Sequence, residues 1–256
     1  MRIDIYLFQN GYCESREKAK YLIEKGYVTA DGRTVKKPSE SADGKTVCVT
    51  GKMEYVSRGG FKLASALDYF RISVENCLCA DIGASTGGFT DCLLQRGAKK
   101  VFCIDSGSGQ LHPSLAHDIR VVNFENYNAK ELNKGLTGGK VDVAVMDVSF
   151  ISQTLLYDGV SDILSDEGVF ISLIKPQFEN SRDALSKSGV VKNRKYHIRA
   201  LDKIILSSRE KGLYCYGIIP SPIKGGDGNT EYLAVFYKSE TESNIDVEKT
   251  VSEALN

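Results

Sequence analysis

The spacing of hydrophobic positions changes along the chain from helix-like to strand-like, and the first such change indicates a small N-terminal region. Apolar residues recur at helical spacing over 2–10 and again in SREKAKYLIEKG (15–26), which begins with a possible serine N-cap and ends in glycine. Asp-Gly pairs at 31–32 and 43–44, flanked by β-branched residues, then predict the tight turns of a β meander. Two helices and short strands together predict a compact α+β unit over residues 1–58, its last residues forming a short linker.

From residue 59 onward, strand-like and helix-like segments alternate. The expected strands are 77–82, 100–105, 142–148, 168–175, 214–220 and 231–238. The expected helices are 59–70, one beginning at Gly88, 153–164 and 194–211. Such alternation predicts a mainly parallel sheet with helices on both faces. The last two strands have no helical segment between them, so we expect them to be antiparallel neighbours.

The end of the chain has a different composition. Residues 239–256 contain one lysine against five acidic residues and no aromatic residue. Such a segment has little apolar surface to bury, so a flexible or weakly helical tail is expected. The chain is therefore divided into 1–58, a larger domain over 59–238, and this acidic tail.

Charge is unevenly distributed, although the 256-residue chain is neutral overall. Residues 1–62 contain 12 Lys and Arg against 8 Asp and Glu, so the basic end is the candidate contact with nucleic acid. Arg16 and Lys20 are four apart and share a helix face that could contact phosphates, but a merely solvated face would look the same. The candidate RNA-binding residues are Arg2, Arg16, Lys18, Lys20, Arg33, Lys36, Lys37 and Arg58.

The first quarter of the chain also resembles a known domain. The stretch RIDIYLFQNGYCESREKAKYLIEKGYVTADGRTVKKP is similar to the S4 RNA-binding domain of ribosomal protein S4 and pseudouridine synthases. The resemblance implies that the second helix and its adjoining loop hold structured RNA.

A glycine-rich turn follows the first strand of the larger domain. In ADIGASTGGFTDCLLQRGA, glycines at 83, 87 and 88 let the backbone turn sharply and approach a ligand. A dinucleotide fingerprint would need glycine at position 85, which is Ser85, so a nicotinamide-dependent dehydrogenase is disfavoured. Asp105, at the end of the next strand, is placed to accept the ribose hydroxyls of a nucleoside cofactor.

The pattern D-x-G-x-x-x-G-G-F-T resembles the S-adenosylmethionine loop of the family that includes the heat-shock 23S rRNA methyltransferase. The fold implied is a Rossmann-like, class I methyltransferase domain with an antiparallel last strand, and the cofactor implied is S-adenosylmethionine. The expected cofactor-binding residues are Asp81, Gly83, Ala84, Ser85, Thr86, Gly87, Gly88, Phe89, Thr90, Asp105, Glu125 and Asp147.

Four ionisable residues occur where this architecture brings chain segments together. Lys62 begins a helix, Asp147 and Lys175 end strands, and Glu231 opens the final strand. Ligands bind at the carboxyl ends of the strands in such sheets. Lys62 and Glu231, taken singly, would read as surface charges, whereas a lysine that ends the apolar run ISLIKP is harder to explain in that way.

The ordered set Lys, Asp, Lys, Glu is that of 2′-O-ribose methyltransferases, and the words SRGGFKL, VMDVSFIS, LIKPQFE and GGDGNTEYL closely resemble the TlyA family. Members of that family join an S4 domain to a methyltransferase domain and methylate cytidine 2′-hydroxyls of 16S and 23S ribosomal RNA. The resemblance implies catalytic roles for Lys62, Asp147, Lys175 and Glu231, with Lys175 as the base or hydroxyl-orienting group. It implies ribosomal RNA or ribosomal subunits as partners.

A different class of function stays open, a non-catalytic RNA-binding assembly factor that retains a vestigial methyltransferase fold. The intact set of four residues argues against it. Some relatives were named haemolysins, but no amphipathic pore-forming or membrane segment is evident, and we expect a cytoplasmic monomer. The seven cysteines are expected to be reduced, and His112, His117 and His197 form no metal-ligand cluster, so no metal is expected.

Overall fold

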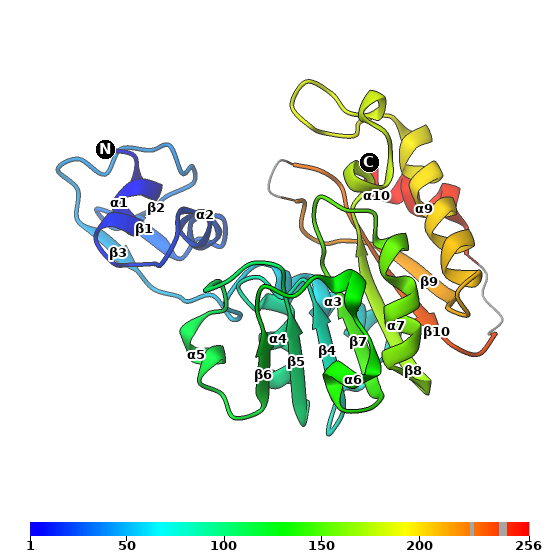
Figure 1. Ribbon diagram of the computed structural model, residues 1–256. Helices are drawn as coiled ribbons and strands as arrows, with labels where there is room; N and C mark the ends of the chain where they lie inside the picture. The colour runs from blue at the N-terminus through cyan, green and yellow to red at the C-terminus, as the bar shows by residue number, and fades with distance from the viewer. Residues whose placement is uncertain (226–227, 241–244, 256) are drawn as a thin grey trace. The chain divides into compact units, whose positions relative to one another are not determined.

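The computed structural model describes residues 1–225, 228–240 and 245–255, and its contacts divide the chain into two compact units, Met1–Ser57 and Arg58–Asn256. The first unit contains helices α1 (Ile3–Gln9) and α2 (Arg16–Glu24) and strands β1 (Val28–Ala30), β2 (Arg33–Thr34) and β3 (Val47–Val49). Figure 1 shows the course of the chain within each unit.

The N-terminal unit forms as its sequence predicts up to the first hairpin. The Ser15 hydroxyl accepts a hydrogen bond from the Lys18 amide at 3.1 Å and caps α2. Asp31 and Gly32 both have positive φ, which suits the tight turn between β1 and β2.

The meander prediction is wrong after that turn, because the strand order is β2-β1-β3 and β3 pairs with β1. The intervening residues form a loop instead of a strand. In this loop the Glu40 carboxylate accepts the amide hydrogens of Lys36 and Lys37, both at 2.8 Å, in place of a partner strand. Pro38 in the same loop has no amide hydrogen to donate to a ladder.

The second unit is built around a seven-stranded sheet with the order β6-β5-β4-β7-β8-β10-β9. Its strands are β4 (Leu78–Ile82), β5 (Lys100–Ile104), β6 (Val121–Phe124), β7 (Val141–Met146), β8 (Leu164–Ile174), β9 (Tyr214–Pro220) and β10 (Tyr232–Tyr237). Strands β4 to β8 pair in parallel, whereas β10 is antiparallel to both β8 and β9. The expected Rossmann-like sheet with an antiparallel last strand is confirmed.

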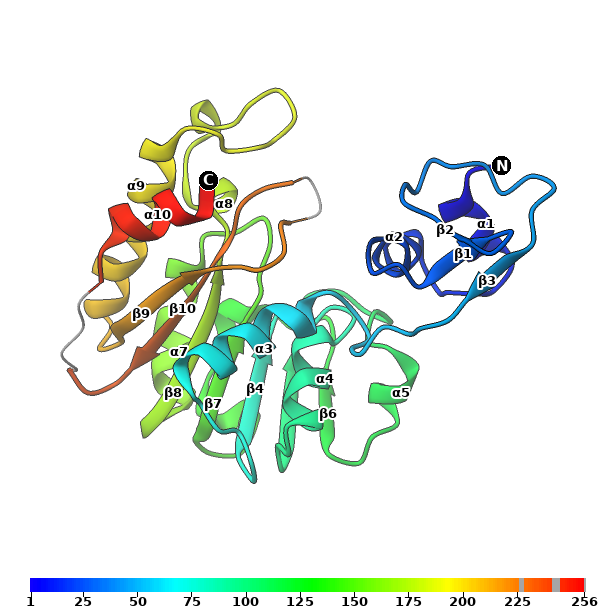
Figure 2. The ribbon, with the colours of Figure 1, turned by 180° about the vertical axis from the view of Figure 1, so that it is seen from behind.

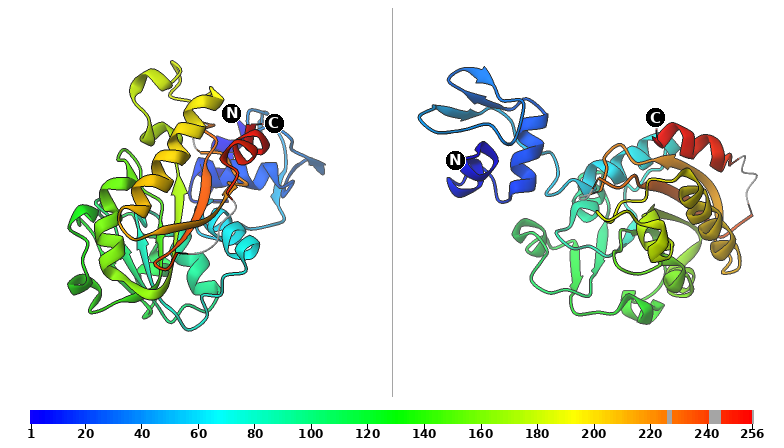
Figure 3. Two further views of the ribbon diagram at one scale, coloured as in Figure 1. Left: turned by 90° about the vertical axis from the view of Figure 1, so that its right-hand side faces the viewer. Right: turned by 90° about the horizontal axis from the view of Figure 1, so that it is seen from above.

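Helices cover both faces of this sheet. They are α3 (Gly59–Phe70), α4 (Gly88–Gln95), α5 (Pro113–Ala116), α6 (Lys134–Thr137), α7 (Tyr157–Ile163), α8 (Pro176–Glu179), α9 (Arg194–Arg209) and α10 (Val247–Leu255). Short 3-10 turns occur at Ala129–Glu131, Gln153–Leu156 and Arg182–Ala184. Helices α3 and α4 lie on the face turned to the viewer in Figure 2. Helices α7 and α9 lie on the opposite face, as the view along the sheet in Figure 3 shows.

The core of the second unit is apolar and aromatic. Tyr157, Phe170 and Phe236 are fully buried, with ring centroids 5.2–6.4 Å apart. Apolar side chains on both faces of β7 and β8 produce the continuous apolar runs seen in the sequence. This rigid layer holds the loops that leave the carboxyl ends of the strands.

The acidic C-terminal segment is helical, which was one of the two expected forms, but unlike the flexible tail that was also expected it packs on the domain. Val247–Leu255 is helix α10, and its Val251 is fully buried, with Val247 and Ala254 packed on the same core cluster. These residues share one helix face, so a few apolar side chains at the right spacing bring an otherwise acidic segment onto the domain. Residues 241–244 and 256 of the predicted tail lie outside the described residues.

Candidate active site

The glycine-rich turn places bare backbone between β4 and α4. Gly83 has a φ of +84°, and a Cβ at this position would lie 2.7 Å from the Asp147 carbonyl oxygen. Gly87 has a φ of +89° and is the N-cap of α4, where a Cβ would meet Leu115. These two positions require glycine both for their conformation and for the close approach of neighbouring chain.

A cavity of about 450 Å³ opens beside this turn, at the carboxyl ends of β4, β5 and β7. This volume lies within the range typical of small-molecule and cofactor sites. Of the residues expected to bind the cofactor, Gly83, Ser85, Asp105 and Asp147 line it. The other lining residues are Ile104, Ser106, Gln110, Asn128, Ala129, Val148, Ser149, Phe150, Ile151 and Leu156.

Asp105 is held in a defined orientation at the edge of this cavity. Its Oδ2 accepts a hydrogen bond from the Ser85 amide at 2.8 Å, and its Oδ1 accepts one from the Gly107 amide at 2.7 Å. Each carboxylate oxygen can accept a further bond, so the side chain can still receive ribose hydroxyls. Glu125 does not line the cavity and accepts a bond from the Gly109 amide at 3.0 Å. It supports the loop that follows Asp105.

Asp81 lies behind the turn and is fully buried. Its Oδ2 accepts hydrogen bonds from the amide and hydroxyl of Thr90, at 2.9 and 2.7 Å, and so joins β4 to α4. Its Oδ1 has no hydrogen-bond partner among the described residues. Burial raises the pKa of Asp81 to about 7; the carboxylates of Asp147 and Asp105 act in the same direction, and the Thr90 bonds oppose them.

The four predicted catalytic residues form two ion pairs. The Lys62 ammonium, in the first turn of α3, lies 2.6 Å from Glu231 Oε2, with both side chains buried. The Lys175 ammonium lies 2.6 Å from Asp147 Oδ1, an ion-pair distance without the angles of a hydrogen bond, and donates to the Ser149 hydroxyl at 2.8 Å.

Strand register brings the two pairs to the same end of the sheet. Ile174 of β8 pairs with Tyr232 of β10, so the next residues outward, Lys175 and Glu231, leave the sheet side by side. Asp147 leaves the adjacent strand β7 and lines the cavity. Two acids and two lysines, far apart in the sequence, are therefore gathered at one end of the sheet, where Asp147 lines the cavity.

Family models match most of the chain in two parts. An FtsJ-like methyltransferase model matches residues 55–238, and an S4 domain model matches residues 1–47. Hemolysin A of Brachyspira hyodysenteriae is 43% identical over 238 residues, which are 92% of this chain and 99% of the relative. The 16S/23S rRNA (cytidine-2′-O)-methyltransferase TlyA of Mycobacterium tuberculosis is 38% identical over 235 residues, 91% of this chain and 88% of the relative. The chain belongs to the TlyA family.

Solved structures agree with this assignment. A structure from Streptococcus thermophilus has a TM-score of 0.77 at 38% identity and covers 99% of this chain and 95% of its own. The 1,6-didemethyltoxoflavin-N1-methyltransferase of Burkholderia thailandensis, with a TM-score of 0.50 at 15% identity over 71% of this chain and 79% of its own, shares the fold. The TlyA-family chain is accordingly an enzyme, a methyltransferase, and its cofactor is S-adenosylmethionine, as the sequence predicted.

In this TlyA-family chain, most of the basic residues predicted to bind RNA are on the surface of the S4 domain. Arg2, Arg16, Lys20, Arg33, Lys36 and Lys37 are exposed, and Lys18 is half-buried and paired with Glu14. Arg58 instead precedes α3, four residues before Lys62, in the methyltransferase unit.

Two of these arginines are organised by one buried acid. Arg2 and Arg16 both donate to the carboxylate of Asp4, at 3.0 and 2.9 Å, while their own side chains are about half exposed. Burial opposes ionisation of Asp4, but the hydrogen bonds and charges of the two arginines outweigh it and lower its pKa. One carboxylate therefore holds two guanidinium groups close together.

Phe150 was not singled out by the sequence. It lies three residues after Asp147, lines the cavity, is 92% exposed and has a φ of +63°. Positive φ in a bulky residue is uncommon and marks strain at functional sites. Its ring lies 5.2 Å from that of Phe178, which the Lys175 ammonium approaches at 5.9 Å. The sequence did contain a signal for Phe150, because this aromatic residue directly follows the Asp-x-Ser segment at the end of a strand.

Among the residues that the structure describes, no group of three or more His, Cys, Asp or Glu side chains could hold a metal ion. No described helix is long and apolar enough to cross a membrane.

Proposed function

We propose that this chain transfers a methyl group from S-adenosylmethionine to a ribose 2′-hydroxyl of ribosomal RNA, with cytidine as the target nucleoside. The observation that carries the proposal is the meeting of the Lys62–Glu231 and Lys175–Asp147 ion pairs at one end of the sheet, where Asp147 lines the cavity. The name of the Mycobacterium tuberculosis relative supports the choice of nucleoside and RNA.

The cavity suits the proposed cofactor. Asp105 has acceptor capacity for ribose hydroxyls, and the bare backbone at Gly83 permits close approach. Asp81, Ala84, Thr86, Gly87, Gly88, Phe89 and Thr90 would act by shaping the turn, and Glu125 by supporting the Asp105 loop. When bound, S-adenosylmethionine supplies an electrophilic methyl carbon.

The proposed chemistry requires a hydroxyl to be aligned and deprotonated. Lys175, the proposed base or hydroxyl-orienting group, would accept the hydroxyl proton once its own ammonium proton has left, and S-adenosylmethionine would supply the methyl group that the ribose oxygen takes up. Asp147 and Ser149 hold the Lys175 side chain in place. Glu231, fixed by Lys62, lies beside Lys175 and orients the ribose. The exposed ring of Phe150 offers a surface on which an unstacked base can rest.

Methyl transfer from labelled S-adenosylmethionine to unmodified small and large ribosomal subunits tests the proposal, with wild type and Lys175→Ala in parallel. Mapping by resistance of the modified position to 2′-OH-dependent cleavage should locate a 2′-O-methylcytidine with wild type alone. Binding of subunits by wild type without any transfer of label would contradict the proposal and favour a non-catalytic assembly factor.

A further inference from the structure

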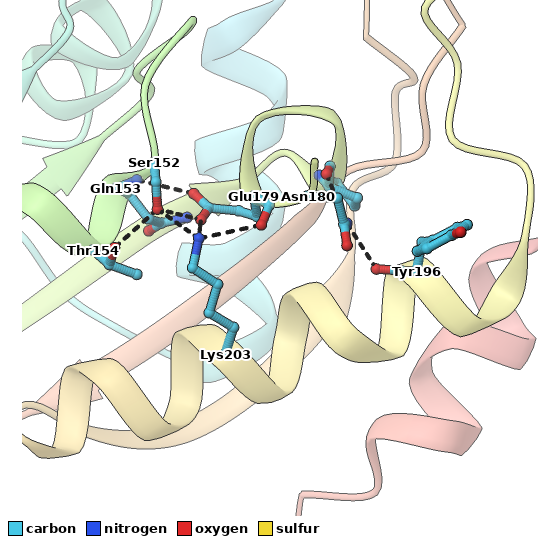
Figure 4. Close-up of polar contacts among 8 residues, drawn as sticks. Ser152, Gln153, Thr154, Glu179, Asn180, Tyr196 and Lys203 are labelled. Atoms are coloured by element: carbon cyan, nitrogen blue, oxygen red, sulfur yellow. Dashed lines mark hydrogen bonds and ion pairs between the residues drawn. The ribbon is translucent and has the colours of Figure 1, made fainter. Parts of the chain in front are cut away.

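A second polar network lies beneath the loops that follow β7 and β8. Figure 4 shows it between those loops and helix α9. The Glu179 carboxylate accepts hydrogen bonds from the Ser152 hydroxyl at 2.5 Å, the backbone N–H of Gln153 at 2.9 Å and the Lys203 ammonium at 3.0 Å. We call Ser152, Gln153, Glu179 and Lys203 the loop clamp.

The clamp is close to saturated in hydrogen bonds. Besides Glu179 Oε2, the Lys203 ammonium donates to the Ser152 hydroxyl at 3.0 Å and to the Glu179 carbonyl at 3.2 Å, so three acceptors surround its three protons. The Glu179 side chain is 2% exposed. A buried carboxylate with this many donors has one strongly preferred position, because leaving any donor costs desolvation energy.

Each end of the clamp is attached to a loop that carries a proposed catalytic residue. Ser152 follows Asp147 by five positions, and Glu179 follows Lys175 by four. A further hydrogen bond, from the Ser172 hydroxyl to the Gln153 side chain, joins the first loop to β8. The clamp thus fixes the two loops to each other and to α9.

We propose that Glu179 and Lys203 are positioning residues for methyl transfer, which hold Asp147 and Lys175 in register through their loops. This inference rests on the proposed function, since it assigns Lys175 and Asp147 to the reaction. Neither Glu179 nor Lys203 lines the cofactor cavity, so neither would contact bound cofactor directly. Displacement of a reacting group by about 1 Å can lower a rate by about a hundredfold.

The test compares kcat and cofactor affinity in the full chain. Glu179→Gln keeps the side-chain shape but removes the charge that holds the Lys203 ammonium. We expect kcat on ribosomal subunits to fall by about 10- to 100-fold. The Kd for S-adenosylmethionine, measured by calorimetry, should change less than about threefold because Gly83 and Asp105 are held by other contacts.

Lys238→Met is the matched control. The Lys238 ammonium donates to the carbonyls of Ser161 and Leu164 at the end of α7, at 2.8 and 3.2 Å, and holds no catalytic loop. The Lys238→Met substitution removes a lysine that donates to carbonyl groups, just as the substitution Lys203→Met in the clamp does. Lys238→Met should leave kcat within about twofold of the wild-type value. Unfolding midpoints from thermal denaturation compare the stability of all variants.

The double variant Glu179→Gln with Lys203→Met guards against loss of fold in the single variants. Removing both charges avoids an unpaired buried group, so stability should recover relative to Glu179→Gln. If the clamp acts by positioning, the kcat of the double variant should stay low although its stability recovers. The single variant Glu179→Asp, which keeps the carboxylate, should have a higher kcat than Glu179→Gln.

Two results would overturn the inference. One is a Glu179→Gln enzyme whose kcat matches that of Lys238→Met at a temperature where both are folded. The other is a loss confined to cofactor affinity. Wild-type turnover in the same assay separates these results from failure of the proposed function, because an inactive wild type would overturn the proposed function and with it the role assigned here.

Discussion

The two ion pairs of the active site have the same 2.6 Å separation but lie in different surroundings. Lys62 and Glu231 have side chains 10% and 3% exposed, and they join α3 to the start of β10 across 169 positions of sequence. Lys175 and Asp147 connect adjacent strand ends, and the Asp147 side chain is 25% exposed and lines the cavity. Distance alone does not decide what an ion pair does. The enclosed pair is suited to hold α3 and the Glu231 carboxylate in place, and the pair at the cavity is suited to take part in proton transfer.

The sharpest contrast is expected when each lysine is removed in turn. Lys175→Ala should lower kcat for methyl transfer by about 10²- to 10⁴-fold, the usual contribution of a proton-transfer group. Its unfolding midpoint should stay close to that of wild type, because Asp147 is partly exposed and can be hydrated. Labelled methyl transfer and thermal denaturation measure the two effects. A Lys175→Ala enzyme with more than a tenth of wild-type kcat would remove Lys175 from the chemistry.

Lys62→Ala should lower stability more than Lys175→Ala does, and it should also lower methyl transfer because Glu231 loses the cation that fixes it. It leaves Glu231 buried without its cation, and breaking a buried pair in this way costs about 3–5 kcal/mol. Lys62→Met with Glu231→Gln should recover most of that loss, since no unpaired charge remains, but should not recover methyl transfer. Urea denaturation of the single and double variants gives the free energies of unfolding. Equal stability of Lys62→Ala and wild type would show that the pair does not hold α3.

Asp81 extends the comparison to a buried carboxylate that has no cationic partner among the residues that the structure describes. Its pKa is about 7 in the folded chain, against 3.8 for the unperturbed group. Between these values the folded chain binds more protons than the unfolded chain, so the contribution of Asp81 to stability is present below about pH 4 and is lost as pH rises toward 7. The loss is a few kcal/mol at most.

Asp81→Asn should remove that contribution to the pH dependence while keeping an oxygen that can accept the bonds from Thr90. Unfolding midpoints of wild type and Asp81→Asn, measured from pH 4 to 8, should converge at low pH and separate in favour of the variant at high pH. Parallel curves across the range would indicate that Asp81 is ionised in the folded chain throughout.

The sequence predicted those features of the site that depend on where a strand ends. Asp105, Asp147, Lys175 and Glu231 each follow or open an apolar strand, and a parallel sheet gathers such residues at one edge. The glycine-rich turn was readable for the same reason, because its glycines stand between a strand and a helix.

Partnerships across the chain could not be read in this way. Nothing local to Glu179 identifies Lys203 as its partner, and the pairing of Lys62 with Glu231 is known only once α3 has packed against the sheet. The left-handed backbone of Phe150 is imposed by the loop that contains it. The pairing of β3 with β1 and the packing of α10 on the domain likewise depend on contacts with distant parts of the chain, which local composition does not reveal.

The smallest effect is expected in the S4 domain, where a buried acid has two half-exposed cations. Asp4 needs one positive charge for its own neutralisation, so one of Arg2 and Arg16 is in excess and available to a phosphate. Arg16→Ala should weaken binding of unmodified ribosomal subunits by the full chain and lower the slope of log K against log salt by about 0.7–0.9, the value for one phosphate contact. Lys25→Ala, an exposed cation at the end of the same helix, serves as control and should leave that slope unchanged. Equal slopes for Arg16→Ala and wild type would mean that the arginine only neutralises Asp4, as Lys62 does for Glu231.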